Sequence, residues 1–307
     1  DWIEAGGQII SPDNIANPES FIASHELIID ALLGTGLARP AAGPMRSWIE
    51  LANQSGVACL AVDLPSGLNA DSGDVIGNAM RSTATTTFIG RKQGLFTGHA
   101  RAYVGEVDFD DLAVPPAIYE QIIAQSVLLQ PGDPRAPLVP QRQRTSHKGD
   151  HGHLLLVGAG TGMVGAAAIA AQAALRVGAG LVSVAVHPDN VAAIAMAQPE
   201  MMVHGVGSAA DLQPLIAQAT VIAIGPGLGQ GRWAHDLWRA LADYSGPLVV
   251  DADALNLLAA APIQRSNWVL TPHPGEAARL LRSTTAKIAQ DRFAAVKALQ
   301  LAFGGVV

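Results

Sequence analysis

Three polar or glycine-rich segments in the second half of the chain each follow a short apolar run that is typical of a buried strand. They are GPGLG at 225–229 after the run 221–224, DADALN at 251–256 after 248–250, and TPHPGE at 271–276 after 268–270. The carboxyl ends of parallel strands share one edge of an open α/β sheet, and ligands bind at that edge. The sequence therefore predicts one ligand site there, with Asp251, Asp253 and His273 among its polar groups. The same residues also have purely structural interpretations, because the aspartates could cap the next helix and His273 could be a hydrogen-bonded turn residue.

A glycine-rich turn, GAGTGMVG at 158–165, lies between a predicted strand at 153–157 and a predicted helix at 164–177. It contains the pattern Gly160-x-Gly162-x-x-Gly165, in which glycines let the backbone approach phosphates at a helix N-terminus. A dinucleotide site also needs an acidic residue near the end of the next strand, where this chain has His187 and Pro188. An ordinary dinucleotide site and a simple tight turn remain open, but the pattern favours another nucleotide-like ligand.

Two segments in the first half also follow predicted strands, DALLGTGL at 30–37 and VDLPSGL at 62–68. Their chemically capable side chains are Asp30, Asp63 and Ser66. Asp63 has a structural alternative as an Asx-turn residue two positions before Pro65.

The elements that must position these residues alternate between short apolar runs and longer amphipathic stretches, which indicates parallel sheets covered by helices. The predicted strands are 27–33, 57–62, 85–89, 153–157, 181–186, 221–224, 248–250 and 268–270. The predicted helices are 44–53, 115–123, 164–177 (ended by a Gly178 cap), 234–241, 275–281 and 287–303. With 307 residues the chain can form two α/β domains, at 1–130 and 148–307, joined by a proline-rich linker at 131–147.

Composition narrows the classes of function. The net charge is −7 with no clustered basic run, so nucleic acid is not an expected partner. No apolar stretch reaches the roughly 18 residues of a membrane helix. The only cysteine is Cys59, which argues against a disulfide framework and favours the cytoplasm. Charged residues make up only 15% of the chain, which permits a homo-oligomer.

The second half resembles the ADP- or ATP-dependent NAD(P)H-hydrate dehydratase family over about 145–307, through HKGxxG at 147–152, the turn leading to Gly165-Ala166, GPGLG, DADALN and TPHPGE in that order. This resemblance implies a ribokinase-like fold in which Ala166, Gly227 and His273 line the hydrated nicotinamide nucleotide. It implies that ADP or ATP, with magnesium, phosphorylates the ring hydroxyl, and that phosphate then leaves to regenerate NAD(P)H.

The first half resembles the NAD(P)H-hydrate epimerase family over about 2–121, which implies a Rossmann-like fold. The resemblance implies that Asp63 contacts the substrate, and Asp63 is also our candidate for the proton transfer of epimerisation. It implies that Asp30 and Ser66 help to hold a potassium ion, which suits their hard oxygen atoms. The other implied substrate contacts are Gly34, Thr35, Gly36, Leu37, Ala38, Arg39 and Pro40.

An epimerase-like half followed by a dehydratase-like half is the arrangement of bifunctional NAD(P)H-hydrate repair enzymes. That family has a further phosphate loop that would precede Asp1, and a Gly-x-Gly-Asp loop with the catalytic aspartate of the dehydratase that would follow Val307. We therefore expect the sequence to be a piece that is cut at both ends, in which no residue can be assigned as that aspartate.

The predicted function is epimerisation of R- and S-NAD(P)HX together with ADP- or ATP-dependent dehydration of the S form. The expected partners are NAD(P)HX and an adenine nucleotide. One alternative is a small-molecule kinase of the ribokinase superfamily, which TPHPGE and the epimerase-like half argue against. The other is a nucleotide-binding remnant without turnover.

Overall fold

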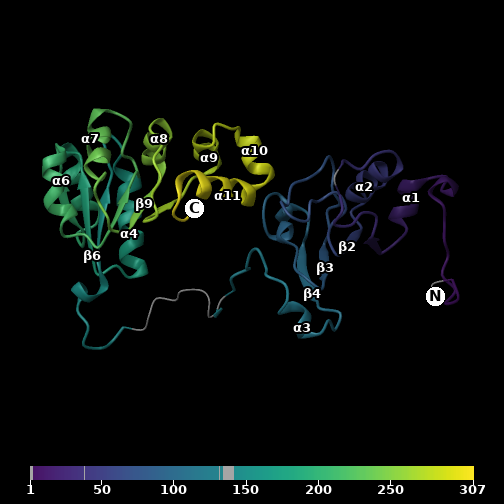
Figure 1. Cartoon of the computed structure of the whole chain (residues 1–307). Coiled ribbons are helices and arrows are strands. Elements are labelled where there is room, and N and C mark those ends of the chain that lie inside the picture. The colour runs from purple at the N-terminus through teal and green to yellow at the C-terminus, as the bar shows by residue number, and fades with distance from the viewer. Residues whose placement is uncertain (1–2, 38, 131, 134–141) are drawn as a thin grey trace. The chain divides into compact units, whose positions relative to one another are not determined.

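The computed structural model describes residues 3–37, 39–130, 132–133 and 142–307 of the chain (Figure 1). The chain forms two compact units, Asp1–Leu128 with Ala289–Phe293, and Leu129–Ile288 with Ala294–Val307. Each unit is built on a parallel sheet of its own, so the α/β class predicted from the sequence is confirmed. Most of the predicted linker 131–147 lies outside the described residues.

The first unit has a four-stranded parallel sheet in the order β1-β2-β3-β4, and β2, β3 and β4 can be followed in Figure 1. Helix α2 begins with Pro44 in its first turn and ends at Ser55, followed by Gly56 as its left-handed C-cap at a φ of 73°. It buries Ile49 and Ala52 against Cys59 of β2. The elements are α1 (Pro18–Ala23), β1 (Leu27–Asp30), α2 (Pro44–Ser55), β2 (Ala58–Val62), β3 (Ala84–Phe88), β4 (Glu106–Asp110) and α3 (Pro116–Tyr119), with short 3-10 helices at Pro12–Asn14, Gln93–Phe96 and Ala100–Ala102.

The second unit has a six-stranded parallel sheet in the order β10-β9-β8-β5-β6-β7. The order reverses at β5, which pairs with both β6 and β8. From residue 148 onward the elements of the chain are β5 (His153–Val157), α4 (Val164–Val177), β6 (Leu181–Val186), α5 (Val191–Ala197), β7 (Met202–Gly205), α6 (Ala209–Ile216), β8 (Val221–Ile224), α7 (Arg232–Ala240), β9 (Leu248–Val250), α8 (Ala252–Ala260), β10 (Trp268–Leu270), α9 (Pro274–Leu280), α10 (Thr285–Gln290) and α11 (Arg292–Phe303), with short 3-10 helices at Lys148–His151 and Pro188–Asn190.

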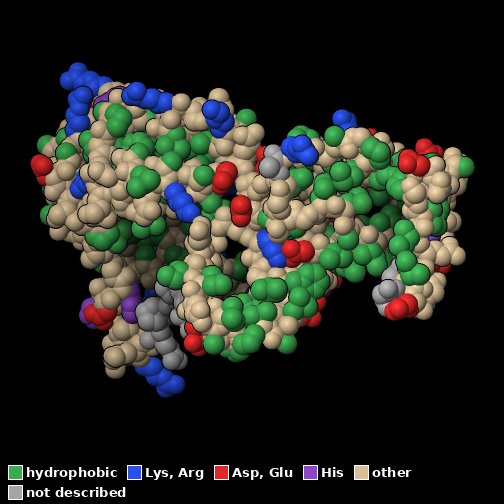
Figure 2. All heavy atoms as spheres, turned by 45° about the vertical axis from the view of Figure 1, so that its right-hand side comes forward, with side chains coloured by type: hydrophobic (Ala, Val, Ile, Leu, Met, Phe, Trp, Pro, Cys, Tyr) green, Lys and Arg blue, Asp and Glu red, His purple; other side chains and the backbone are tan. Residues whose placement is uncertain are grey.

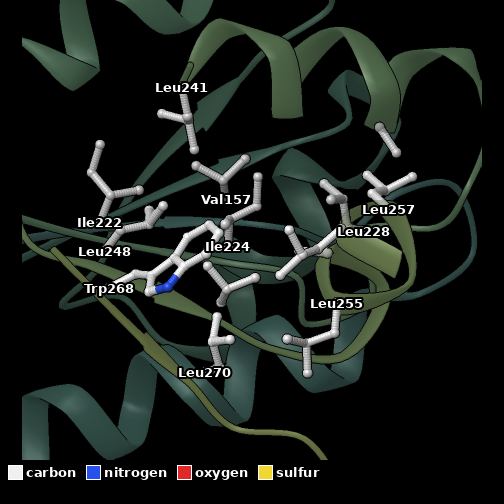
Figure 3. Close-up of a cluster of buried hydrophobic side chains, with 14 of the residues drawn as sticks. Val157, Ile222, Ile224, Leu228, Leu241, Leu248, Leu255, Leu257, Trp268 and Leu270 are labelled. Atoms are coloured by element: carbon white, nitrogen blue, oxygen red, sulfur yellow. The ribbon is translucent and has the colours of Figure 1, made fainter. Parts of the chain in front are cut away.

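Helices cover both faces of this second sheet, and alternate residues of β5 enter the two cores. Leu155 and Val157 belong to the larger core with α6, α7, α8 and α9, part of which Figure 3 shows around Trp268. Leu156 belongs to the smaller core, where α4 contributes Ala167 and Ala171. A central strand that is buried on both faces explains why β5 reads as a continuous apolar run.

All five strands predicted for the second half, β5, β6, β8, β9 and β10, are confirmed at their predicted bounds. Helix α4 is confirmed too, with Gly178 as its left-handed C-cap at φ 109°. The single helix predicted at 287–303 is wrong, because it is interrupted at Asp291. Asp291 belongs to a residue type that favours helix N-caps, and it stands directly before α11. Strands β4 and β7 and helices α5 and α6 were not anticipated.

Charged side chains on the face that Figure 2 shows are dispersed among hydrophobic and neutral ones, with acidic and basic groups interspersed. Within the residues described, none of the helices has both the length and the apolar character to cross a membrane.

Leu155 tests the larger core, since it is fully buried on the central strand β5. Leu155→Ala should lower the free energy of unfolding by about 2–5 kcal/mol, because a cavity replaces the lost side chain. Urea denaturation followed by tryptophan fluorescence measures this, with Trp233, Trp238 and Trp268 reporting on this unit. The control Ile263→Ala, at a side chain that is 46% exposed, should change stability by no more than about 0.5 kcal/mol.

Candidate functional site

Asp30 and Ser66 meet at the carboxyl edge of the first sheet, although 36 residues separate them. Asp30 is the last residue of β1 and is 1% exposed, and Ser66 lies in the turn after β2. The Ser66 hydroxyl donates to Asp30 Oδ1 at 2.6 Å, and the Ser66 amide donates to Oδ2 at 2.7 Å. The Leu33 amide donates to Ser66 Oγ at 2.8 Å, and the Leu33 carbonyl oxygen lies 3.4 Å from Oγ. A carboxylate, a hydroxyl and a carbonyl oxygen therefore converge in one buried cluster.

Asp63 directly follows β2 at the same sheet edge, with a φ of 72° that is unusual for a residue with a side chain. Its Oδ1 accepts hydrogen bonds from the Thr87 hydroxyl at 3.1 Å and from the Phe88 amide at 3.2 Å, and it pairs with the Lys92 ammonium. Burial acts to raise the pKa of Asp63, but these hydrogen bonds and the charge of Lys92 outweigh it, so the pKa lies below its usual value. Asp63 is therefore ionised at neutral pH.

The loop after β1 carries the other predicted substrate contacts of this unit. Gly34, Thr35, Gly36, Arg39 and Pro40 are exposed, and Leu37 is half-buried. Ala38 lies outside the described residues. On the far side of the loop, Gly77 adopts a φ of 86°, and a Cβ on it would lie 2.9 Å from the Cβ of Pro40. The structure thus places this loop on the same sheet edge as Asp30 and leaves its glycines open to solvent.

In the second unit, the turns after β5 and β8 are joined by backbone hydrogen bonds. The Ala159 amide donates to the Pro226 carbonyl oxygen at 3.1 Å, and the Gly160 amide donates to that of Gly227 at 2.6 Å. Gly227 has a φ of 62°, and a Cβ there would lie 2.6 Å from the Met163 carbonyl oxygen. Only glycine fits this position, because both the backbone conformation and the space exclude a side chain.

The two aspartates of the DADALN segment do not act as helix caps, which corrects the structural interpretation. Asp251 is the N-cap residue of α8, but its side chain makes no capping hydrogen bond. Its Oδ1 accepts instead from the Thr271 hydroxyl at 2.8 Å, and Asp253 Oδ2 accepts from the Gly229 amide at 2.8 Å. These side chains tie together the turns that follow β8, β9 and β10.

His273 is a hydrogen-bonded turn residue, as the structural interpretation held, but its ring is also accessible to solvent. Its Nδ1 accepts from the Gly275 amide at 3.0 Å, and its own amide donates to Glu276 Oε2 at 2.9 Å, so it caps α9 with a reciprocal box. The His273 side chain is nevertheless 62% exposed. Ala166, in the first turn of α4, is also exposed. Ala166, Gly227 and His273 therefore all belong to segments that follow strands at one edge of the second sheet.

Three residues with roles at these edges were not predicted from the sequence. Lys92 and Thr87 hold Asp63, and the basic pair Arg91-Lys92 after a predicted strand was the available signal. Asn190 is 8% exposed, and its Nδ2 donates to the carbonyl oxygens of Ala159 and Gly160, both at 2.9 Å. Asn190 thus holds the glycine-rich turn from about 30 residues away in the sequence. It lies in no sequence motif from which this role could be predicted.

The sequence profile of the NAD(P)H-hydrate dehydratase family matches residues 154–307, half of the chain. This chain belongs to the NAD(P)H-hydrate dehydratase family. Residues 2–94 match a second family, described as YjeF-related protein N-terminus. The two matches therefore correspond to the two halves distinguished in the sequence.

Similar proteins include bifunctional NAD(P)H-hydrate repair enzymes of Coxiella burnetii, 46% identical over 94% of this chain, and of Escherichia coli, 41% identical over 99%. The chain spans 59% and 58% of the length of these two relatives. A crystal structure of a ribokinase-like superfamily protein from Enterococcus faecalis is 29% identical, with a TM-score of 0.50, over 54% of this chain and 59% of that protein. The predicted ribokinase-like fold of the dehydratase half is thereby confirmed.

Asn190 provides a test of how the glycine-rich turn is held. Asn190→Ala should cost about 1–3 kcal/mol of stability, because two hydrogen bonds are lost from carbonyl oxygens that then keep only one backbone donor each. Asn190→Asp should cost more, because it keeps the shape but turns carboxylate oxygens toward those carbonyls. Urea denaturation gives this ranking, with the exposed neighbour Asp189→Asn as a near-neutral control. An Asn190→Asp protein as stable as the unmodified chain would contradict the role assigned to this side chain.

Proposed function

We propose that this chain carries the substrate-binding parts of a bifunctional NAD(P)H-hydrate repair enzyme. In this proposal the first unit epimerises R- and S-NAD(P)HX, and the second binds S-NAD(P)HX for ADP- or ATP-dependent dehydration. The observation that carries the proposal is that each sheet gathers its predicted site residues at its own carboxyl edge. Family membership and the names of the relatives support the same assignment.

Epimerisation inverts a ring carbon that bears a hydroxyl group beside the ring nitrogen. The carbon–oxygen bond breaks with the hydroxyl leaving as water, the nitrogen lone pair compensates, and water adds to the opposite face. Departure of the hydroxyl consumes one proton and addition of water releases one. The reaction therefore needs a group beside this carbon that exchanges protons with the oxygen bound to it. Asp63 suits the addition step, because its ionised carboxylate can accept the proton of the incoming water.

The Asp30 cluster fits the potassium ion that the family resemblance implies. Asp30 is buried, and in the part of the chain that the structure describes its oxygens accept from neutral groups only, the Ser66 hydroxyl and amide and the Leu32 amide. A buried carboxylate calls for a cation, and hard oxygen ligands suit an alkali ion. Asp30 and Ser66 would hold the ion, which would supply positive charge beside the exposed loop from Gly34 to Pro40.

For the dehydratase half, we assign to Ala166, Gly227 and His273 the binding of the hydrated nicotinamide. The exposed methyl group of Ala166 leaves room for a ring to approach the start of α4, and Gly227 allows the tight turn that follows β8. Because His273 Nδ1 accepts from the Gly275 amide, Nε2 is the ring atom that can donate a hydrogen bond, and it lies 3.2 Å from Glu276 Oε1. Magnesium bound with ADP or ATP would neutralise the nucleotide phosphates. The described residues hold no group of three or more His, Cys, Asp or Glu side chains suited to a metal, so we assign none of them to magnesium.

A cytoplasmic location belongs to the same proposal. It is supported by Cys59, a free and buried thiol of a kind that persists in a reducing compartment. Assembly into a homo-oligomer stays a prediction from the sequence.

The direct test supplies R- and S-NADHX to the chain and to a protein of the relatives' full length. Epimer interconversion is followed by chromatography, and dehydration with magnesium and ADP or ATP by the absorbance of NADH. Asp63→Asn should lower epimerisation at least about 100-fold, because the proton acceptor is lost, and should leave dehydration of the S form unchanged. Asp71→Asn, an exposed aspartate in the same unit, is the control. Failure of both proteins to act on either epimer would refute the proposal.

The potassium assignment is tested without turnover by thermal unfolding in KCl and in choline chloride at equal ionic strength. The unmodified chain should melt at a higher temperature in KCl, since a ligand that binds only the folded state stabilises it. Asp30→Asn should lose this difference and Ser66→Ala should reduce it, while Asp71→Asn keeps it. Because each variant is compared with itself in two salts, its intrinsic stability cancels. An undiminished difference in Asp30→Asn would place the ion elsewhere.

A further inference from the structure

The Lys92 side chain is anchored to the end of β3 and directed at Asp63. Its ammonium donates to the Phe88 carbonyl oxygen at 2.9 Å and to Asp63 Oδ1. The side chains are only 19% and 26% exposed, so water screens this ion pair less than one on an open surface. We propose that Lys92 is a positioning residue of the epimerase reaction, holding Asp63 ionised and correctly oriented, an inference that rests on the proposed function.

The backbone on both sides of Lys92 is built to keep it in place. On its N-terminal side, Ile89 is a β-branched residue at a φ of 64°, which is a strained conformation. The Ile89 amide donates to the Asp110 carbonyl oxygen at 2.9 Å, and its own carbonyl oxygen accepts from the Tyr119 hydroxyl at 2.8 Å. These contacts with β4 and α3 hold the strained residue and reverse the chain directly after β3.

On the C-terminal side, Lys92 leads into the 3-10 helix Gln93–Phe96. A Cβ on Gly94 would lie 2.2 Å from the Asn69 carbonyl oxygen, so this helix is packed directly against the backbone that follows Leu68. Leu95 is 1% exposed in the core beneath. The lysine therefore stands between two fixed segments, which limits the conformations open to its long side chain.

The ion pair matters for proton transfer because Asp63 acts as a base only while it is ionised. Burial disfavours the ionised carboxylate, and Lys92 supplies both a hydrogen bond and a positive charge that favour it. The other charged groups around this edge include Asp30 at the end of β1, the exposed Arg39 on the loop after β1, Asp110 at the end of β4, and Arg91, whose guanidinium stacks on the Phe109 ring at 4.7 Å. Asp30 and Asp110 are acidic and Arg91 is engaged elsewhere, which leaves Lys92 as the cation in contact with Asp63 among the described residues.

The direction in which removal of Lys92 changes the pKa of Asp63 can therefore be predicted. Without the ammonium, its hydrogen bond and positive charge no longer offset burial, so the pKa of Asp63 rises and the carboxylate is lost at a higher pH than in the unmodified chain. The acid limb of kcat/KM for epimerisation should move to higher pH in Lys92→Met. The loss should be largest at the acid end of the pH range and should shrink toward pH 8, where the carboxylate is ionised in both proteins. It should fall on kcat rather than KM, because Lys92 acts through Asp63.

The experiment measures interconversion of R- and S-NADHX from pH 5 to pH 9 with the unmodified chain, Lys92→Met and Lys92→Arg. Arginine keeps the charge and donor groups in a different geometry, so it should restore the position of the acid limb and part of kcat. Arg91→Met is the matched control, since it removes a positive charge one residue away that does not contact Asp63. In parallel, the Asp63 carboxyl carbon is titrated by NMR in each protein, with Asp63→Asn to assign the signal and circular dichroism to verify folding.

The outcomes separate this inference from the proposed function. An unmodified chain that fails to interconvert the epimers refutes the proposed function, and with it the role of Lys92. Interconversion by the unmodified chain with an unchanged acid limb in folded Lys92→Met overturns the positioning role alone. A higher KM with unchanged kcat also overturns it, because Lys92 would then bind substrate directly. If Lys92→Met does not fold, Lys92→Gln replaces it in both measurements, and an unchanged titration of Asp63 in folded Lys92→Gln overturns the positioning role.

Discussion

Direct backbone contact between neighbouring strand-end turns is the constraint on which the second unit depends. A Cβ on Gly225 would lie 1.7 Å from the Asp251 carbonyl oxygen, which leaves no space for any other residue between β8 and β9. The amides of Ala159 and Gly160 bond to the next turn in the same way. Because hydrogen bonds fix these turns to one another, Gly227 and the exposed His273 keep a defined relation although 46 residues separate them in the sequence.

In the first unit, the environments of two carboxylates, and not direct backbone contact, distinguish the residues at the sheet edge. Its two carboxylates stand at adjacent strand ends but in opposite environments, Asp30 buried among neutral donors and Asp63 half-buried against Lys92. Environments that differ in this way are how one fold gives two carboxylates separate tasks. Asp30 suits the holding of a cation, whereas Asp63 carries its own counter-charge and remains available to exchange a proton.

The sequence predicted the apolar strands well, including the edge strands β1 and β10, but it missed the edge strands β4 and β7, for a physical reason. Strands such as β5 are buried on both faces and read as unbroken apolar runs, whereas the edge strand β4, EVDFD, mixes acidic and apolar residues. Asp30, Ser66, Gly227 and His273 were identifiable because they lie within contiguous motifs. Lys92 and Asn190 were not, because they act on atoms 29 and 30 to 31 residues away, a relation that only the folded chain creates.

Strained backbone conformations occur in the turns at the same sheet edges. Among the described residues, non-glycine positions with positive φ include Asp63 and Ile89 after β2 and β3, and Ala159 and Ala252 after β5 and β9. Such conformations cost about 1–3 kcal/mol each and persist only where the surroundings enforce them. A fold selected for stability alone would place glycine at these positions. Of these four residues, Asp63 is the one to which the proposed function assigns chemistry, whereas Ile89, Ala159 and Ala252 shape the turns without presenting a reactive group.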